Sequence, residues 1–398
     1  MVKKILLGFI CFWLLLFLGG CWDKREINDS AIPLAIGVDL REDKKIQVTA
    51  LLTQPRPSAE PEAHKATQLI SANDRGAAMA ARRLHLSLSQ FLEWAHVRTF
   101  VLGENLASQD LALVIDFMTR NRNLRPDMNL MICGQTKPEK LFAQIGSLGD
   151  GGLMQLVFFS ERQSGIYTPM DIGEFAYRLT TPGIEPAVPM VILKTETSKR
   201  PIAEIMNKKP PQTNNKQEKI VLQGMAVFKG PKMVGILNEK ESRGYRWLNS
   251  KHKQGGMFAV KSPLDPESSV ALETVRFSGK TRPSLKDEEL KMRIDIEANL
   301  SFYETTGTAE LLTPETISLL EEQAGVTIKD QIAACIKRSQ QLNSDILGWG
   351  SKIHSYEPKE WQRLKTEWNT IFPHVEADIH VKVHIKRAYL ARKINGFK

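Results

Sequence analysis

Two segments of strict alternation between apolar and polar residues constrain this fold more than any other feature of the sequence. Residues 292–302 place an apolar side chain at every second position, and residues 375–385 repeat the pattern. A period of two predicts strands with one buried and one solvated face, which is typical of antiparallel sheets. Between them, Thr313 and Pro314 predict the N-cap and first turn of a long helix that reaches about Leu342. A sheet with helices packed on its apolar side predicts an α+β lobe.

The first half of the chain shows a different pattern, in which strand-like and helix-like segments take turns. Apolar runs predict strands at 33–39, 45–52, 95–102 and 130–133. Apolar positions spaced three and four apart predict helices at 73–91, which Asn73 would cap, and at 106–120, 137–145 and 170–180. This alternation predicts an N-terminal lobe of α/β character.

A change of composition predicts where the two lobes are joined. Residues 194–218 are rich in Lys, Pro and Asn and have almost no apolar periodicity, as expected for a linker. We therefore expect a signal peptide at 1–20, an N-terminal domain at 21–193 with room for two subdomains, the linker at 194–218 and a C-terminal domain at 219–398. The expected fold class is α+β and multi-domain, with mixed or antiparallel sheets and packed helices, and with an antiparallel sheet plus a long helix in the C-terminal lobe.

The N-terminus has the pattern of an export signal. Two lysines precede an apolar run at 5–18, which is too short to span a hydrocarbon layer that takes about 20 residues to cross. Residues 18–21 (Leu-Gly-Gly-Cys) look like a bacterial lipobox, in which the cysteine thiol takes a diacylglyceryl group before cleavage. Cys21 is therefore the expected lipid attachment site and the new N-terminus. An ordinary cleaved signal, with Cys21 incidental, is the alternative.

The remaining composition restricts the possible partners. The formal net charge is +9 in 398 residues, which is modest and suits attraction to an anionic lipid surface. We expect no nucleic-acid partner for an exported and tethered chain. Cys133 and Cys335 lie in apolar stretches and are expected to be free, buried thiols, with a disulfide as the less favoured alternative.

A search for catalytic or metal-binding patterns predicts none, and we expect no cofactor. His380 and His384 share the polar face of the last strand at a Cα separation of about 13 Å, too far apart to share a zinc ion. The glycine-rich segment 146–152 lacks the Gly-Lys-Ser/Thr ending of a phosphate loop, so a flexible loop is the better interpretation. Trp361 and Trp368 have helical spacing and are expected in the core, with a ligand-stacking role as the alternative. A Ser–His–Asp triad assembled from distant positions remains open at this point.

Several short segments along the whole chain resemble one known family. They are residues 20–27, beginning Gly-Cys-Trp-Asp, and 36–39, 101–104, 116–117 with Arg120, 179–186, 224–229, 235–239, 345–348 and 361–368. In these segments the chain resembles the Ger(x)C spore-germination lipoproteins, the C subunits of GerA-type nutrient germinant receptors.

The resemblance implies a function and partners. It implies a non-catalytic, lipid-anchored subunit required for nutrient-triggered spore germination, on the extracytoplasmic face of the spore inner membrane. Its implied partners are an integral membrane A subunit and a transporter-like B subunit. Cys21 is the one functional residue that maps, and the family supplies no catalytic residue.

Two other classes of protein remain as alternatives. An extracytoplasmic solute-binding lipoprotein would need two doubly wound lobes, whose buried parallel strands are continuously apolar. The alternation at 292–302 and 375–385 argues against that architecture. An enzyme is the third possibility, and hydrolysis by the purified protein would support it.

Overall fold

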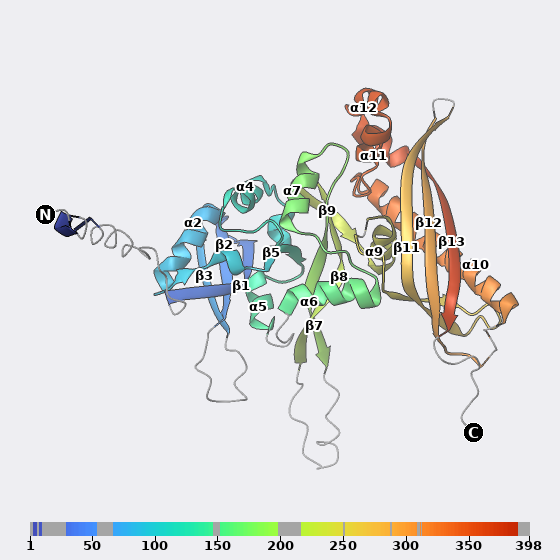
Figure 1. Ribbon diagram of the computed structural model, residues 1–398, viewed down its shortest axis with the longest axis horizontal. Helices are drawn as coiled ribbons and strands as arrows, with labels where there is room; N and C mark the ends of the chain where they lie inside the picture. The colour runs from blue at the N-terminus through green and yellow to red at the C-terminus, as the bar shows by residue number, and fades with distance from the viewer. Residues whose placement is uncertain are drawn as a thin grey trace, which may run out of the picture.

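The computed structural model forms two lobes, each built on its own β-sheet (Figure 1). The structure describes residues 3–5, 8–9, 29–53, 67–145, 152–197, 216–249, 251–286, 289–308, 311 and 313–388. Cys21, residues 146–151 of the glycine-rich segment and all of the expected signal peptide except residues 3–5 and 8–9 lie outside these residues. Among the helices of the described residues, none combines the length and the apolar character that a membrane span requires.

A nine-stranded mixed sheet forms the N-terminal lobe, in the order β3-β2-β1-β5-β6-β7-β8-β9, with β4 beside β1. Its inner strands β1, β5, β6 and β7 are parallel neighbours, and its outer strands are antiparallel. The strands are β1 (Ser30–Leu40), β2 (Ile46–Thr53), β3 (Thr67–Asp74), β4 (Phe91–Leu92), β5 (Thr99–Gly103), β6 (Asn129–Cys133), β7 (Ala187–Thr197), β8 (Lys216–Lys229) and β9 (Lys232–Leu237). The predicted α/β character of this lobe is confirmed.

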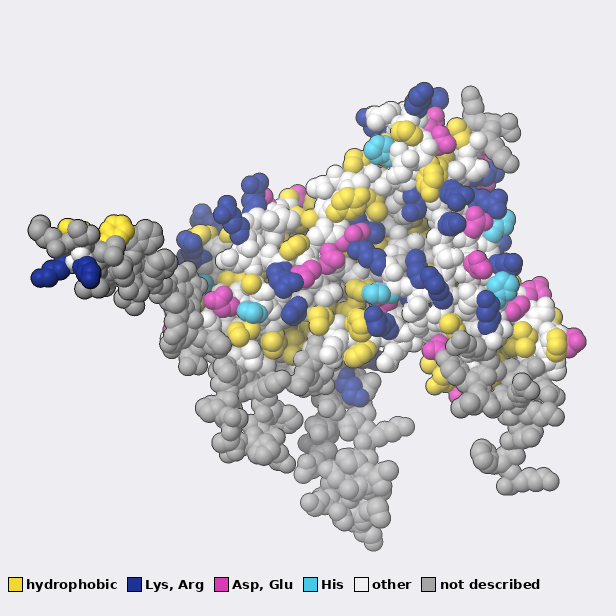
Figure 2. All heavy atoms as spheres, viewed as in Figure 1, with side chains coloured by type: hydrophobic (Ala, Val, Ile, Leu, Met, Phe, Trp, Pro, Cys, Tyr) yellow, Lys and Arg dark blue, Asp and Glu magenta, His cyan; other side chains and the backbone are white. Residues whose placement is uncertain are grey.

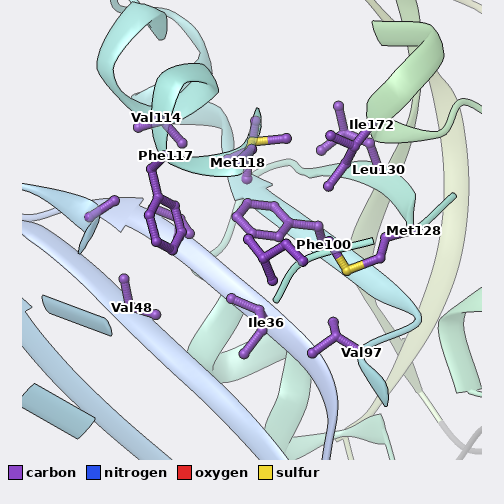
Figure 3. Close-up of a cluster of buried hydrophobic side chains, with 14 of the residues drawn as sticks. Ile36, Val48, Val97, Phe100, Val114, Phe117, Met118, Met128, Leu130 and Ile172 are labelled. Carbon is purple, nitrogen blue, oxygen red and sulfur yellow. The ribbon is translucent and has the colours of Figure 1, made fainter. Parts of the chain in front are cut away.

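Helices cover both faces of this sheet, which explains why its inner strands are continuously apolar. They are α2 (Ala77–Arg83), α3 (Glu104–Ala107), α4 (Ala112–Arg120), α5 (Pro138–Ala143), α6 (Gly152–Phe159) and α7 (Ile172–Thr180). Phe100 of β5 packs with Phe117 and Met118 of α4 on one face (Figure 3). Its neighbour Val101 packs with Phe142 of α5 on the other face.

Two helix predictions in this lobe need correction. The helix expected at 73–91 begins only at α2, because residues 67–74 pair with β2 as strand β3, and Gly76 rather than Asn73 is the N-cap. It ends at Arg83 and continues as a short 3₁₀ turn. The helix expected at 106–120 is two helices, α3 and α4, and Asp110 between them accepts the N–H of Ala112 at 2.8 Å.

The structure also corrects both ends of the expected linker. Residues 194–197 end β7 and pair with residues 216–219 of β8. Both ends of the expected linker therefore belong to an antiparallel pair of strands. Residues 198–215 lie outside the described part of the chain. The polar ends of the two strands carry no periodicity because the described side chains there are exposed. Strands β8 and β9, most of whose residues fall within the expected C-terminal domain at 219–398, complete the first sheet.

The C-terminal lobe contains the four-stranded sheet β10-β11-β12-β13 with helices packed against it. Its elements are α9 (Glu239–Asn249), β10 (Met257–Lys261), β11 (Ser269–Lys286), β12 (Glu289–Thr305), α10 (Pro314–Gln341), α11 (Trp349–Tyr356), α12 (Pro358–Leu364), α13 (Trp368–Ile371) and β13 (Glu376–Ala388). The antiparallel sheet expected here is mixed, because β12 and β13 pair in parallel. The connection through α10 to α13 is a crossover, and a crossover returns the chain in the same direction.

The long helix α10 is confirmed with its predicted start. Thr313 is the N-cap and its hydroxyl accepts the N–H of Thr316 at 3.3 Å, while Pro314 occupies the first turn. A buried stripe of α10 packs on the sheet and contains Leu320, Ala324, Ile328, Ile332 and Cys335. Both Cys133 and Cys335 are free and buried, as predicted, and burial raises the pKa of the Cys133 thiol to about 12.

Shortening one side chain of this stripe tests the packing. Ile332 is fully buried, so Ile332→Val should lower the free energy of unfolding by about 1 kcal/mol through loss of one methylene. Val326 lies on the same helix with half of its surface exposed. Val326→Ala should therefore change stability by less than about 0.5 kcal/mol. Urea unfolding of both variants gives the comparison, and equal effects would contradict this assignment of the buried face.

Candidate functional site

Four of the segments that carry the family resemblance meet where the two lobes join. They are residues 179–186, 224–229, 345–348 and 361–368, and we call this region the interlobe junction. Backbone hydrogen bonds of 2.9 and 3.1 Å join the first segment to the third and to the second. A tryptophan side chain of the fourth donates to the third at 3.0 Å. Residues far apart in the sequence thus form one contiguous structure.

Asp345 is the buried centre of the interlobe junction, with 4% of its surface exposed. One carboxylate oxygen accepts the N–H of Trp349 at 2.9 Å. The other accepts the N–H of Gly350 at 2.8 Å and the indole N–H of Trp368 at 3.0 Å. The two backbone donors belong to the first turn of α11, where N–H groups have no partner within the helix. Asp345 therefore caps α11 and fixes Trp368 at the same time.

Glu185 is a second carboxyl group in the junction, on the segment that leads into β7. Its Oε2 accepts the N–H of Gly230 at 2.8 Å, and its own N–H donates to the carbonyl of Asp345 at 2.9 Å. Burial raises the pKa of Glu185 to about 7, and the nearby charge of Asp345 raises it further. The hydrogen bond from Gly230 and the charge of Lys229 lower this pKa, but their combined effect is smaller. Burial raises the pKa of Asp345 to about 6 despite its donors.

These raised pKa values predict how stability depends on pH. The folded protein keeps protons on Glu185 and Asp345 that the unfolded chain releases near 4.5 and 3.8. Their contribution is therefore fully present below those values and is lost as pH rises toward 7. Thermal midpoints of Glu185→Gln between pH 4 and 8 should fall less with rising pH than those of the native protein. Asp378→Asn, at an exposed carboxyl group, is the control and should retain the native decline.

The two lobes touch backbone to backbone beside these carboxyl groups. Gly183 has φ +76°, and a Cβ built there would lie 2.6 Å from the Cα of Gly350 in α11. The N–H of Ser351 donates to the carbonyl of Gly183 at 2.9 Å. A Cβ on Gly350 would in turn lie 2.7 Å from the ring of Trp361. Only glycine at both positions allows this approach.

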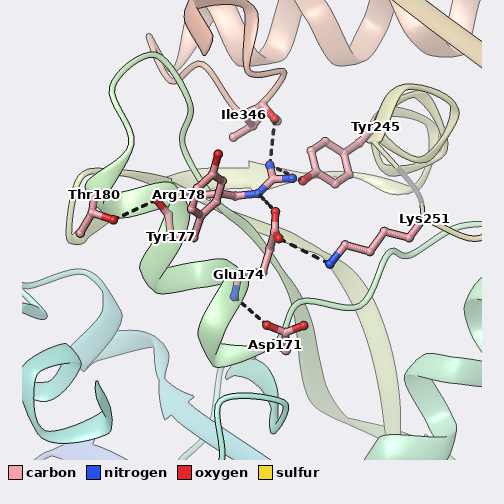
Figure 4. A network of polar contacts seen from close by, with 8 residues as sticks. All are labelled: Asp171, Glu174, Tyr177, Arg178, Thr180, Tyr245, Lys251 and Ile346. Atoms are coloured by element: carbon pink, nitrogen blue, oxygen red, sulfur yellow. Dashed lines mark hydrogen bonds and ion pairs between the residues drawn. The ribbon is translucent and has the colours of Figure 1, made fainter. Parts of the chain in front are cut away.

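A buried arginine adds a polar contact between the lobes (Figure 4). Arg178 of α7 donates to Glu174 at 2.7 Å, to the hydroxyl of Tyr245 in α9 at 3.1 Å and to the carbonyl of Ile346 at 3.4 Å. Lys251 donates to the second oxygen of Glu174 at 3.4 Å. A buried guanidinium needs such partners to offset its desolvation. The network therefore ties α7 to α9 and to the segment that precedes α11.

A small cavity of about 160 Å³ remains at the junction. Glu185, Asn343, Asp345 and Lys365 contribute to its lining together with aromatic rings, and the described lining contains no serine, cysteine or histidine. Within the described residues, no group of three or more His, Cys, Asp and Glu side chains has the geometry to hold a metal ion. Glu185, Asp345 and Arg178 each have hydrogen-bond partners in the junction, so the arrangement supports a fixed relation between the lobes.

The structure does not bring the remaining sequence candidates together in one site, although Trp361 and Trp368 both lie in the interlobe junction. Cys21 lies outside the described residues. His380 is exposed on β13, as expected for a solvated strand residue, and its ring lies 2.7 Å from Asp378. Trp361 and Trp368 are buried, which confirms their place in the core. Sequence reasoning missed the roles of Glu185, Asp345 and Arg178, although the first two lie in segments already noted for the resemblance.

Comparison with known protein families covers most of the chain. The model described as "Spore germination protein N-terminal domain" matches residues 23–193. The model described as "Spore germination B3/ GerAC like, C-terminal" matches residues 223–389.

Similar proteins match over nearly their full length. Spore germination protein KC of Bacillus subtilis (strain 168) is 23% identical, covering 98% of this chain and 97% of the relative. Spore germination protein A3 of the same organism is 20% identical, covering 96% and 97%. The crystal structure of the GerBC protein superposes with a TM-score of 0.54 at 16% identity, covering 88% of this chain and 96% of that one. The two-lobed α+β fold is therefore shared with a solved structure.

Proposed function

Because the chain belongs to the spore germination B3/GerAC-like family, we propose that it is a lipid-anchored, non-catalytic subunit of a spore nutrient germinant receptor. The observation that carries the proposal is the family match over both lobes. The proposed partners are the integral membrane A and B subunits of the receptor. The proposed location is the extracytoplasmic face of the spore inner membrane, with a diacylglyceryl group on Cys21 as the anchor.

The architecture suits a protein that presents surfaces to partners. The contacts of Asp345, Gly183 and Arg178 hold the two lobes in one orientation, so surfaces on both lobes keep a constant relation. The solute-binding alternative finds no support in the second lobe, whose mixed sheet alternates between buried and exposed side chains. A doubly wound lobe would have helices on both faces of a parallel sheet.

Germination of spores that lack the protein tests the proposed role. They should fail to respond to the nutrients of this receptor, yet should germinate normally with a non-nutrient trigger that bypasses receptors. The drop in optical density of spore suspensions measures both responses. Normal nutrient germination, in a strain from which all other receptors are removed, would overturn the assignment. Equal failure with both triggers would place the protein elsewhere in the pathway.

The anchor has a separate test. Cys21→Ala should abolish incorporation of labelled fatty acid, because the thiol that would accept the diacylglyceryl group is gone. Cys11→Ala is the matched control, since Cys11 precedes the expected cleavage point and should leave labelling intact. Two acyl chains hold a protein far more firmly than one, so the Cys21 variant should also leave the membrane fraction unless partner subunits retain it.

A further inference from the structure

The length of chain between the proposed anchor and the first strand limits which surface can face the membrane. Ser30, where β1 begins, lies nine positions after Cys21, and a chain spans at most about 3.3–3.6 Å per residue. Ser30 therefore lies within roughly 30 Å of the lipid attachment point, whatever the conformation between them. In Figure 1, β1, β2, β3 and α2 lie at the end of the molecule remote from the four-stranded sheet.

Large apolar side chains are exposed on the segment from Met79 to Phe91, whose last residue lies beside the start of β1. Phe91 of β4 pairs directly with Ser30 and is 55% exposed. Leu86 is 82% exposed, and Met79 of α2 is 54% exposed. Single exposed apolar residues are ordinary on protein surfaces. The informative observation is that this segment ends beside the point where the chain leaves toward its anchor.

A cavity that Met79 helps to line also carries two arginine side chains. It has a volume of about 520 Å³ between α2 and α4, with Arg82, His85 and Arg120 in its lining and Met79 in its wall. Figure 2 shows Lys and Arg side chains gathered over the same end of the N-terminal lobe. Arg120 forms an exposed ion pair with Asp116. Arginine beside exposed apolar residues suits a surface of acyl chains and phosphate groups.

We propose that Met79, Arg82, Leu86, Phe91 and Arg120 form an anchor-side face that rests on an anionic phospholipid bilayer. Arg82 and Arg120 meet lipid phosphates, while Leu86 and Phe91 enter the boundary between headgroups and acyl chains. The inference rests on the proposed acylation of Cys21, since the tether brings this end of the molecule to the membrane. It deepens the proposed function by stating which surface faces lipid and which remains for other contacts.

Site-specific fluorescence on the intact lipoprotein tests the proposal. Leu86→Cys is labelled with an environment-sensitive dye, and the acylated protein is reconstituted into phosphatidylglycerol–phosphatidylcholine vesicles whose acyl chains carry a bromine quencher. The native Cys133 and Cys335 are buried and stay unlabelled. Leu319→Cys, on exposed α10 surface in the other lobe, is the matched control, and Phe91→Cys is a second position in the face.

The expected result is quenching of the labels at 86 and 91 and none at 319. Adding Arg82→Gln should lower the ratio of docked to undocked protein about fivefold, whereas Lys359→Gln on α12 should leave it unchanged. Protein that floats with the vesicles while its label at 86 stays unquenched would overturn the anchor-side face and leave the proposed anchor intact. Shielding of that label only after membrane-protein subunits are added would also overturn it. If the protein does not float with the vesicles, the proposed anchor is wrong, and the anchor-side face is wrong with it.

Discussion

Asp345→Ala is expected to lower the free energy of unfolding by about 3–5 kcal/mol. Three donors, the N–H groups of Trp349 and Gly350 and the indole N–H of Trp368, lose their acceptor inside the protein. Each buried donor left without a partner costs about 1–3 kcal/mol. Urea unfolding of the purified protein measures the change, followed by tryptophan fluorescence because Trp349 and Trp368 lie at the site.

Two further variants separate the hydrogen bonds from the charge. Asp345→Asn keeps one oxygen acceptor and should cost clearly less than the alanine variant, since its amide group replaces only one oxygen with a donor. Asp378→Ala removes an exposed carboxylate on β13 and should cost less than about 1 kcal/mol. A loss below about 1 kcal/mol for Asp345→Ala would show that the junction does not depend on this carboxyl group.

Gly183→Ala is expected to destabilise the protein by about 3 kcal/mol or more. Its left-handed conformation alone costs a side chain about 1–2 kcal/mol. The added Cβ would in addition lie 2.6 Å from the backbone of Gly350 in α11, a contact that only a shift of backbone atoms can relieve. Limited proteolysis should therefore detect faster cleavage between the lobes, and thermal unfolding should begin at a lower temperature.

Gly230→Ala provides the matched control. Gly230 also has a positive φ, of +53°, but a Cβ there meets nothing within 4 Å. Its variant keeps the N–H that donates to Glu185 and should lose only the conformational part, about 1–2 kcal/mol. Equal losses for the two variants would mean that the close contact between Gly183 and Gly350 contributes nothing to stability.

Both predictions concern the same property, the fixed relation between the lobes. A receptor subunit could contact lipid through one lobe and other proteins through the other. If its junction were flexible, binding would have to fix the two lobes relative to each other, and the entropy lost would reduce the free energy of binding. Junction variants that fold should therefore reduce germination even though they alter no exposed surface. Such an effect would link the buried contacts of Asp345 and Gly183 to the proposed function.

Local features of the fold could be predicted because their causes are local. Thr313 and Pro314 start α10 through contacts within one turn, and the alternation at 292–302 follows from the pleat of a single strand. The same reasoning failed at 73–91. There the apolar spacing fits a helix, yet residues 73–74 pair with β2, α2 ends at Arg83 and Phe91 pairs with β1.

The interlobe junction was only partly accessible from the sequence. Segments 179–186 and 345–348 were singled out by resemblance, but their residues do not predict that the two segments are in contact. The pKa of Glu185 rises through burial and through Asp345, which lies 160 residues away in the sequence. In the sequence Arg178 is an ordinary helix residue, and only the structure shows that Tyr245 and Ile346 accept its hydrogen bonds.

The sequence by itself determined the start of α10, the alternating strands at 292–302 and 375–385, the α+β class and the family. Those properties depend on residues that are neighbours in the chain or on motifs that can be read directly. Only the tertiary structure decided that β8 and β9 complete the first sheet, that β12 and β13 run parallel and that two carboxyl groups meet between the lobes. Strand partners and burial depend on contacts between distant segments, and hydrophobic periodicity reports which face of an element is buried but not what buries it.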